Sequence, residues 1–236
     1  MIELIELRKK YNRLEVLKGI STKFNQSECI ALIGPNGCGK TTLIKSILGM
    51  VLPDSGEITF NNKSIFNETD YRNYIGYMPQ IGKYPENMSI GQIVEMMKEL
   101  RGGHLSFDED LYKAYKLEQI LNKRMRTLSG GTTQKVSAAL AFMFNPLVYI
   151  LDEPTAGLDP ISAEILKEKM LLEKSKGKLI LITSHLLSDL EELVSEIVFM
   201  QDGELLIHQT VEELKNKTGE EKLSKAISTI LKAQLI

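Results

Sequence analysis

A glycine-rich segment near the N-terminus has the residue types that hold phosphate groups. Its letters GPNGCGKT, at positions 34–41, fit the pattern G-x-x-x-x-G-K-[ST] and lie between a predicted strand and a predicted helix. Glycines let backbone N–H groups turn toward phosphate oxygens, and a helix that begins near Lys40 adds the positive end of its dipole. Lys40 is then expected to reach the β- and γ-phosphates of a nucleotide, and Thr41 to bind Mg²⁺. The alternative is a glycine turn that merely joins a strand to a helix.

Two acidic residues follow the apolar run LVYIL at positions 147–151. A carboxylate at the end of a central parallel strand points into the crevice where such sheets bind ligands, so Asp152 is predicted to hold Mg²⁺, directly or through water. Glu153 comes one residue later, where it could orient or deprotonate an attacking water. The alternative is a pair of solvated acids that open a turn before Pro154. The phosphate loop upstream favours the metal site.

The alternation of strands and helices predicts how these residues are positioned. Strands are expected at IELIEL near the start, at CIALI (29–33), near 57–60 and 74–78, and at LVYIL, KLILIT and SEIVFM. Helices are expected from Lys40 to Gly49, from Ser89 with Gln92 as a capping box, through most of 85–145, from Pro160, from about Leu187, and twice in the tail. This order predicts an α/β fold with a largely parallel sheet.

Composition excludes several classes of protein. The 236 residues are 43% hydrophobic and carry 29 Lys and Arg against 31 Asp and Glu, a net charge of −2. A disordered chain or a general nucleic-acid binder does not fit these values, so no nucleic-acid partner is expected. Cys29 and Cys38 are too few for a disulfide framework, which favours a reducing compartment. The longest stretch without charge, 136–151, is shorter than the ~20 residues that span a bilayer.

Four segments together resemble the ATP-binding subunit of an ABC transporter. They are GPNGCGKTT, LSGGTTQKV at 128–136, LVYILDEPTAGLD at 147–159, and TSH ending at His185. The resemblance covers nearly the whole chain. It implies a P-loop NTPase ABC cassette of class α/β, with a mostly parallel core sheet, an N-terminal antiparallel β subdomain and an inserted helical subdomain. A single domain over 1–236 is expected, with the helical subdomain at about 85–145 and a helical tail at about 210–236.

The resemblance also implies a role for each matching residue. ATP would be bound by Tyr11, Gly34, Pro35, Asn36, Gly37, Cys38, Gly39, Lys40, Thr41, Thr42, Ser129, Gly130 and Gly131. Mg²⁺ would be held by Thr41, Gln80 and Asp152, and the catalytic residues would be Glu153, His185 and Gln80. Plain structural alternatives are a surface tyrosine at position 11, a polar loop residue at position 80 and a helix N-cap at Ser129.

Two signature positions depart from the family. Thr132 stands where Gln is usual, and Lys135 stands where Arg is frequent. Neither change removes a backbone N–H donor, so Mg²⁺-dependent ATP hydrolysis is expected to survive. Asp159 precedes Pro160 and is predicted to cap the next helix.

One phosphate loop and one LSGG signature per chain imply half of a shared site. The resemblance therefore implies an ATP-sandwiched dimer with a second ATP-binding subunit, identical or not, and a separate integral membrane permease that docks near 81–97, with Tyr84, Met88 and Met96 as contacts. The chain would be cytoplasmic, peripheral on the cytoplasmic face of the cell membrane.

Within the family, the sequence pattern most resembles the ABC-2 exporters, and among them the copper-processing ATPases of nitrous-oxide reductase maturation. A soluble ABC ATPase of iron–sulfur cluster assembly and a low-turnover assembly or regulatory module stay open as alternatives.

Overall fold

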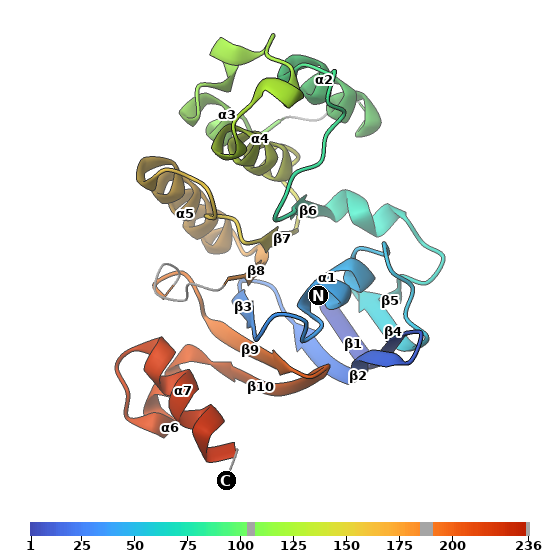
Figure 1. Cartoon of the computed structure of the whole chain (residues 1–236), viewed down its shortest axis with the longest axis vertical. Helices are drawn as coiled ribbons and strands as arrows, with labels where there is room; N and C mark the ends of the chain where they lie inside the picture. Colours follow the sequence, from blue (N-terminus) through green and yellow to red (C-terminus); the bar gives the residue numbers. More distant parts are fainter. Residues whose placement is uncertain (103–106, 185–190, 235–236) are drawn as a thin grey trace.

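A largely parallel sheet forms the centre of the molecule (Figure 1). The computed structural model describes residues 1–102, 107–184 and 191–234. The sheet has six strands in the order β10-β9-β3-β8-β7-β6. These are β3 (Cys29–Ile33), β6 (Ile75–Met78), β7 (Val148–Asp152), β8 (Leu179–Thr183), β9 (Glu196–Gln201) and β10 (Glu204–Thr210). All neighbours pair in parallel except β10, which is antiparallel to β9. The predicted α/β class and largely parallel sheet are confirmed, whereas β10 was not predicted.

The central strands are buried on both faces. In β3, Cys29, Ala31 and Ile33 face one hydrophobic cluster, whereas Ile30 and Leu32 face another. Successive side chains of a strand point to opposite faces, so a strand between two apolar layers must be apolar at every position. This explains why CIALI and LVYIL read as unbroken apolar runs rather than alternating ones.

A second, antiparallel sheet covers one of these faces. It has four strands in the order β2-β1-β4-β5. Their bounds are β1 (Ile2–Tyr11), β2 (Leu14–Phe24), β4 (Ser55–Phe60) and β5 (Lys63–Ser64). Helix α1 (Lys40–Ile47) buries Leu43, Ile44 and Ile47 in the cluster that joins the two sheets. The antiparallel β subdomain expected near the N-terminus is therefore present.

Helices of the predicted 85–145 segment gather at the end of the molecule opposite the antiparallel sheet (Figure 1). They are α2 (Ile90–Leu100), α3 (Asp110–Ala114) and α4 (Gly130–Phe142), with short 3₁₀ turns between α3 and α4. Ser89 begins α2 with the predicted capping box: its N–H donates to Gln92 Oε1 at 2.9 Å, and Gln92 N–H donates back to Ser89 Oγ at 3.3 Å.

The remaining helices follow the core strands. They are α5 (Pro160–Ser175), α6 (Val211–Thr218) and α7 (Leu223–Gln234). Asp159 caps α5 as predicted, because its Oδ1 accepts from Ser162 N–H at 2.9 Å and Pro160 follows it. The helix expected from about Leu187 begins outside the described residues. Among the helices that are described, none combines the length and apolar character needed to cross a bilayer.

A buried charge network joins the helical subdomain to the core. Lys169 on α5 is only 4% exposed, and its Nζ contacts carboxylate oxygens of Asp108, of Asp110 at 2.7 Å and of Glu173 at 3.2 Å. Glu173 is fully buried and also accepts from Lys176 at 2.8 Å and from Tyr149 Oη at 3.0 Å. Since Tyr149 belongs to β7, the network runs from the loop before α3 through α5 to the central sheet.

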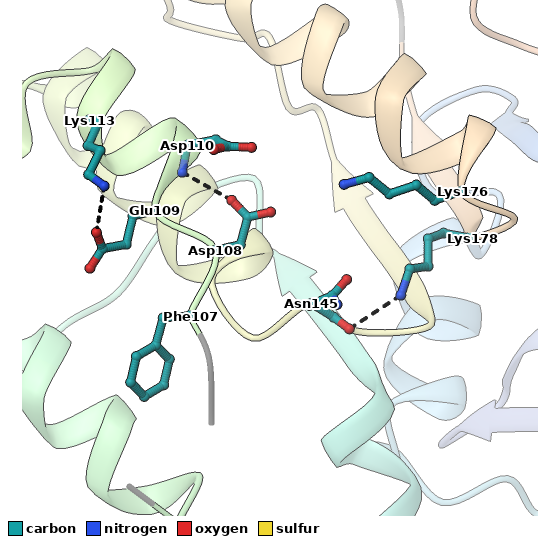
Figure 2. A pocket seen from close by; sticks show the side chains of 8 residues that line it. All are labelled: Phe107, Asp108, Glu109, Asp110, Lys113, Asn145, Lys176 and Lys178. Atoms are coloured by element: carbon teal, nitrogen blue, oxygen red, sulfur yellow. Dashed lines mark hydrogen bonds and ion pairs between the residues drawn. The ribbon is translucent and has the colours of Figure 1, made fainter. Parts of the chain in front are cut away.

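Mutual pairing keeps these groups charged despite their burial. Burial alone would lower the pKa of the Lys169 ammonium, but its hydrogen bonds to Asp108 and Asp110 outweigh burial and raise it. Burial alone would raise the pKa of Glu173, but hydrogen bonds from Lys176 and Lys169 lower it. The network borders an open pocket of about 640 Å³. In it, the Asp108 carboxylate points toward Lys176, Glu109 pairs with Lys113 at 2.9 Å, and Lys178 donates to the carbonyl oxygen of Asn145 at 3.4 Å (Figure 2).

We expect Lys169→Met to destabilise the fold. Removing the ammonium leaves carboxylates of Asp108 and Glu173 buried with fewer partners, which costs about 3 kcal/mol of unfolding free energy. Lys167→Met is the matched control. Among the described residues, the one ion pair of Lys167 is with exposed Glu164 at 3.7 Å, so its loss should change stability by about 0.5 kcal/mol or less. Urea unfolding measures both. Equal effects of the two substitutions would contradict a structural role for the network.

Candidate functional site

One pocket collects residues that are far apart in the sequence. Its volume is about 550 Å³. Its lining consists of Tyr11, Val16, Asn36, Gly37, Gly39, Lys40, Thr41, Thr42, Gln80, Asp152, Glu153 and Thr183. The phosphate loop follows β3, and Gln80 comes shortly after β6. Asp152 is the last residue of β7, and Thr183 is the last residue of β8. Since β3, β6, β7 and β8 are parallel, their carboxyl ends meet at one edge of the sheet, where open α/β sheets bind ligands.

Close packing requires glycine in the phosphate loop. Gly34 has φ +146°, and a Cβ there would lie 2.0 Å from the carbonyl oxygen of Met200 on β9. Gly39 has φ +110°, and its Cβ would lie 2.7 Å from the carbonyl oxygen of Val16. A side chain at either position is therefore excluded by backbone on both sides of the loop. Gly34 and Pro35 do not line the pocket, and the Cys38 thiol is buried in the core.

Lys40 begins α1 and reaches back across the loop. Its Nζ donates to the carbonyl oxygens of Gly34 at 2.6 Å and Pro35 at 3.1 Å. The ammonium thus lies over the concave side of the loop, next to the N-terminus of α1. Backbone N–H groups, a helix N-terminus and a lysine at one place form a site suited to phosphate.

The two acidic residues at the end of β7 are held by the neighbouring strand β8. Asp152 Oδ1 accepts a hydrogen bond from Thr183 Oγ1. Glu153 N–H donates to the carbonyl oxygen of Thr183 at 3.2 Å and to its Oγ1 at 3.1 Å. Glu153 has φ 51°, a left-handed conformation that is uncommon for a residue with a side chain. This backbone turn directs the chain away from the sheet just where the two carboxylates enter the pocket.

The oxygen atoms in the pocket fit a magnesium ion. Mg²⁺ prefers hard oxygen ligands and retains several waters, so it needs only a few protein groups. Thr41 supplies a hydroxyl, Gln80 an amide oxygen and Asp152 a carboxylate, and all three line the same pocket. These three groups are suited to Mg²⁺ by their chemistry, and their role as its ligands stays a prediction.

Tyr11 lies at the pocket's outer edge, at the end of β1. Its side chain is exposed to 45%, which leaves ring surface for a flat ligand group, and Lys9 Nζ lies 5.6 Å from the ring centroid. An exposed aromatic face beside a phosphate loop is suited to stacking on a base. The structure thus brings together Tyr11, the loop, Gln80, Asp152 and Glu153.

The signature residues lie elsewhere. Ser129, Gly130 and Gly131 do not line the pocket; they form the N-terminus of α4. Ser129 Oγ accepts from Thr132 N–H at 3.3 Å, so the N-cap role is confirmed, and the hydroxyl of Thr132 lies 2.9 Å from it. The predicted catalytic residue His185 lies outside the described residues.

Lys135, at the other unusual signature position, pairs with Asp159. Their Nζ and Oδ2 atoms are 2.8 Å apart. The hydrogen bond from Lys135, followed by those from the N–H and hydroxyl of Ser162, lowers the pKa of Asp159. This ion pair ties α4 to the start of α5, in a position where arginine would do the same.

Sequence reasoning missed three residues at the site. Thr183 and Val16 line the pocket, and Gln134, which is buried on α4, donates from Nε2 to the carbonyl oxygen of Glu153 at 3.4 Å. Thr183 had a usable signal, since a hydroxyl at the carboxyl end of the apolar run LILI lies at the ligand-binding edge of a parallel sheet. Val16 and Gln134 have none, because their positions depend on tertiary packing.

Comparison with known proteins agrees with this geometry. The family model described as "ABC transporter" matches residues 17–156. YxlF of Bacillus subtilis (strain 168), named an uncharacterized ABC transporter ATP-binding protein, is 32% identical over 222 residues, which are 92% of this chain and 73% of YxlF. SrtF of Streptococcus pyogenes, named a lantibiotic transport ATP-binding protein, is 31% identical over 92% of this chain and 93% of SrtF. A solved structure described as the ATP binding subunit of an ABC transporter has a TM-score of 0.87 at 28% identity, covering 98% of this chain and 99% of that one. The chain therefore belongs to the ABC transporter family, as an ATP-binding subunit.

Proposed function

We propose that this chain hydrolyses ATP with Mg²⁺ and thereby drives transport through a separate membrane permease. The observation that carries the proposal is the single pocket that joins the phosphate loop to Gln80, Asp152 and Glu153. A loop alone would support nucleotide binding. Carboxylates and an amide beside it supply what hydrolysis needs in addition.

The proposed roles follow from position in the pocket. Backbone N–H groups of residues 36–42 and the Lys40 ammonium bind the phosphates, while the ring of Tyr11 stacks on adenine. Thr41, Asp152 and Gln80 would hold Mg²⁺, which would supply positive charge to offset that of the phosphates. Thr183 is a positioning residue, because its hydroxyl fixes the Asp152 carboxylate.

Glu153 is the proposed general base. It accepts a proton from a water molecule as the water oxygen forms a bond to the γ-phosphorus, and the bond from that phosphorus to the bridging oxygen of ADP breaks. Gln80 orients this water, and the family resemblance assigns the contact with the γ-phosphate to His185. ADP and inorganic phosphate are the products.

We propose that the active unit is a dimer in which each ATP lies between two chains. Ser129, Gly130 and Gly131 offer N–H groups and a positive helix end, which suit an anion, yet they lie outside this chain's own pocket. A second ATP-binding subunit, identical or not, would bring its phosphate loop to them. ATP then joins the two chains, and loss of the γ-phosphate releases them.

The permease is proposed to dock beside residues 81–97, which places the chain in the cytoplasm on the inner face of the cell membrane. Of the three expected contacts there, Tyr84 and Met88 are partly buried against the core, and Tyr84 also lines a surface groove. Met96 is half-buried. Export is the proposed direction, on the resemblance to ABC-2 exporters. Copper processing stays a proposal for the cargo class. The transport name of SrtF supports transport over iron–sulfur cluster assembly or a low-turnover module. The whole of 1–236 is proposed to act as one cassette.

Replacing Glu153 by Gln is expected to stop turnover and to trap an ATP-bound dimer. The amide keeps the shape of the side chain but cannot take a proton, so the ATP hydrolysis rate should fall by ~100-fold or more. Phosphate release and light scattering with ATP and Mg²⁺ measure the two effects. Glu164→Gln on α5 is the control, because Glu164 is outside the pocket. Unchanged turnover in Glu153→Gln would refute the assignment of Glu153 as the base.

Mixing two inactive variants tests whether sites are shared between chains. Lys40→Ala removes a phosphate contact, and Ser129→Arg blocks the signature, so each variant alone should be inactive. In a mixed dimer, the intact loop of one chain meets the intact signature of the other, and hydrolysis should reappear. If each chain worked alone, mixing would restore nothing. Measuring ATPase activity against the mixing ratio distinguishes the two arrangements.

A further inference from the structure

The peptide that follows the proposed base has an unusual backbone conformation. Glu153 has φ 51°, in the left-handed region, and the next residue is Pro154. A residue with a side chain seldom adopts this region, and a following proline favours an extended conformation instead. Such a conformation persists only where the surrounding contacts hold it. The contacts of the Glu153 backbone therefore decide where its side chain points.

Those contacts come from two different subdomains. The Glu153 N–H donates to the carbonyl oxygen of Thr183 at 3.2 Å and to its Oγ1 at 3.1 Å. The Glu153 carbonyl oxygen accepts from Nε2 of Gln134 at 3.4 Å. Thr183 ends a strand of the core sheet, whereas Gln134 lies on α4 of the helical subdomain. The peptide between Glu153 and Pro154 has no N–H, so its carbonyl is the group through which a hydrogen bond can fix its rotation.

Packing alone does not account for an amide at position 134. Gln134 is only 5% exposed, on a helix whose other buried residues include Val136, Ala138 and Ala139. An apolar side chain of the same length would fill this space without the cost of burying a polar group. A buried amide is retained at least cost where it donates to an acceptor, and the Glu153 carbonyl oxygen is such an acceptor.

Two further contacts tie α4 to the segment 153–159. A Cβ on Gly131 would lie 2.7 Å from the carbonyl oxygen of Gly157, so the two backbones approach closely there. Lys135 Nζ lies 2.8 Å from Asp159 Oδ2. With the Gln134 contact, these join the first turns of α4 to the segment that carries the base. A shift of α4 therefore also moves the backbone at Glu153.

We propose that Gln134 is a positioning residue for ATP hydrolysis, because it holds the Glu153–Pro154 peptide so that the Glu153 carboxylate stays directed at the attacking water. Gln134 does not itself line the nucleotide pocket. The start of the same helix, at Ser129, is where the partner's ATP is proposed to bind, so that ATP also steadies the base of this chain. This inference rests on the proposed hydrolysis and adds a residue that sets its rate.

Gln134→Met tests this role, because methionine has a similar length and no N–H to donate. In steady-state assays with ATP and Mg²⁺, kcat should fall about tenfold while KM for ATP changes by less than about twofold, since Gln134 does not line the pocket. Gln119→Met, the same exchange at an exposed position of the helical subdomain, should change neither value. If the wild type hydrolyses ATP and Gln134→Met equals it, the positioning role is wrong. If the wild type itself hydrolyses no ATP, the proposed function fails.

Gln134→Glu separates positioning from packing through its pH dependence. Burial raises the pKa of the introduced carboxyl above its usual range. The ionised carboxylate repels the Glu153 carbonyl oxygen, whereas the protonated carboxyl donates its O–H to that oxygen. The rate relative to the wild type at the same pH should therefore rise several-fold as the pH falls from about 8 to about 6. With Gln119→Glu as the control, a ratio that is equally flat for both variants would overturn the proposal.

A double variant shows where Gln134 acts. Glu153→Gln is expected to hold an ATP-bound dimer, and adding Gln134→Met should leave the amount of dimer in light scattering unchanged. Loss of the dimer in the double variant would assign Gln134 to the binding of the partner's ATP and overturn its role at the base. If Glu153→Gln alone forms no dimer, the shared site is wrong, and kcat and the pH dependence decide the role of Gln134.

Discussion

Burial of the parallel strands on both faces is the constraint on which the other features depend. Because β3, β7 and β8 lie between two hydrophobic clusters, their side chains are apolar along the strands except for the Tyr149 hydroxyl, which is bonded to Glu173. Polar chemistry is possible only where the strands end. All these strands are parallel, so their ends coincide at one edge, and the loop after β3, the acids after β7 and Thr183 at the end of β8 must meet there. The packing that makes the core thus also fixes where the site lies.

Short-range sequence patterns predicted much of the core sheet and of the pocket. CIALI and LVYIL are apolar at every position because of the two-sided burial, and both are strands of the core sheet. Ser89 with Gln92, and Asp159 with Pro160, mark helix starts that depend only on neighbouring backbone groups, and both predictions are confirmed. The pocket's loop and acids followed from motifs whose spacing reflects the strand–loop order.

Contacts between distant segments were not predictable in this way. Nothing local to Lys169 indicates that Asp108, on another subdomain, would pair with it, and nothing local to Gln134 indicates that it reaches the backbone of Glu153. Strand β10 was not predicted, because its pairing with β9 determines its conformation more than its own mixed polar and apolar residues do.

Helix α4 connects these distant features physically. Its N-terminus carries the signature at Ser129, and its middle contacts the Glu153 carbonyl through Gln134. Its last turn, at Leu140 and Ala141, lines the same surface groove as Tyr84. The helix has 13 residues and a length of about 20 Å, and it is too short and too well packed to bend easily. A displacement imposed at the groove is therefore transmitted to the signature as a rigid-body movement. If the permease and the partner's ATP bind as proposed, they contact opposite ends of this one helix, which gives a mechanical reason why each would respond to the other.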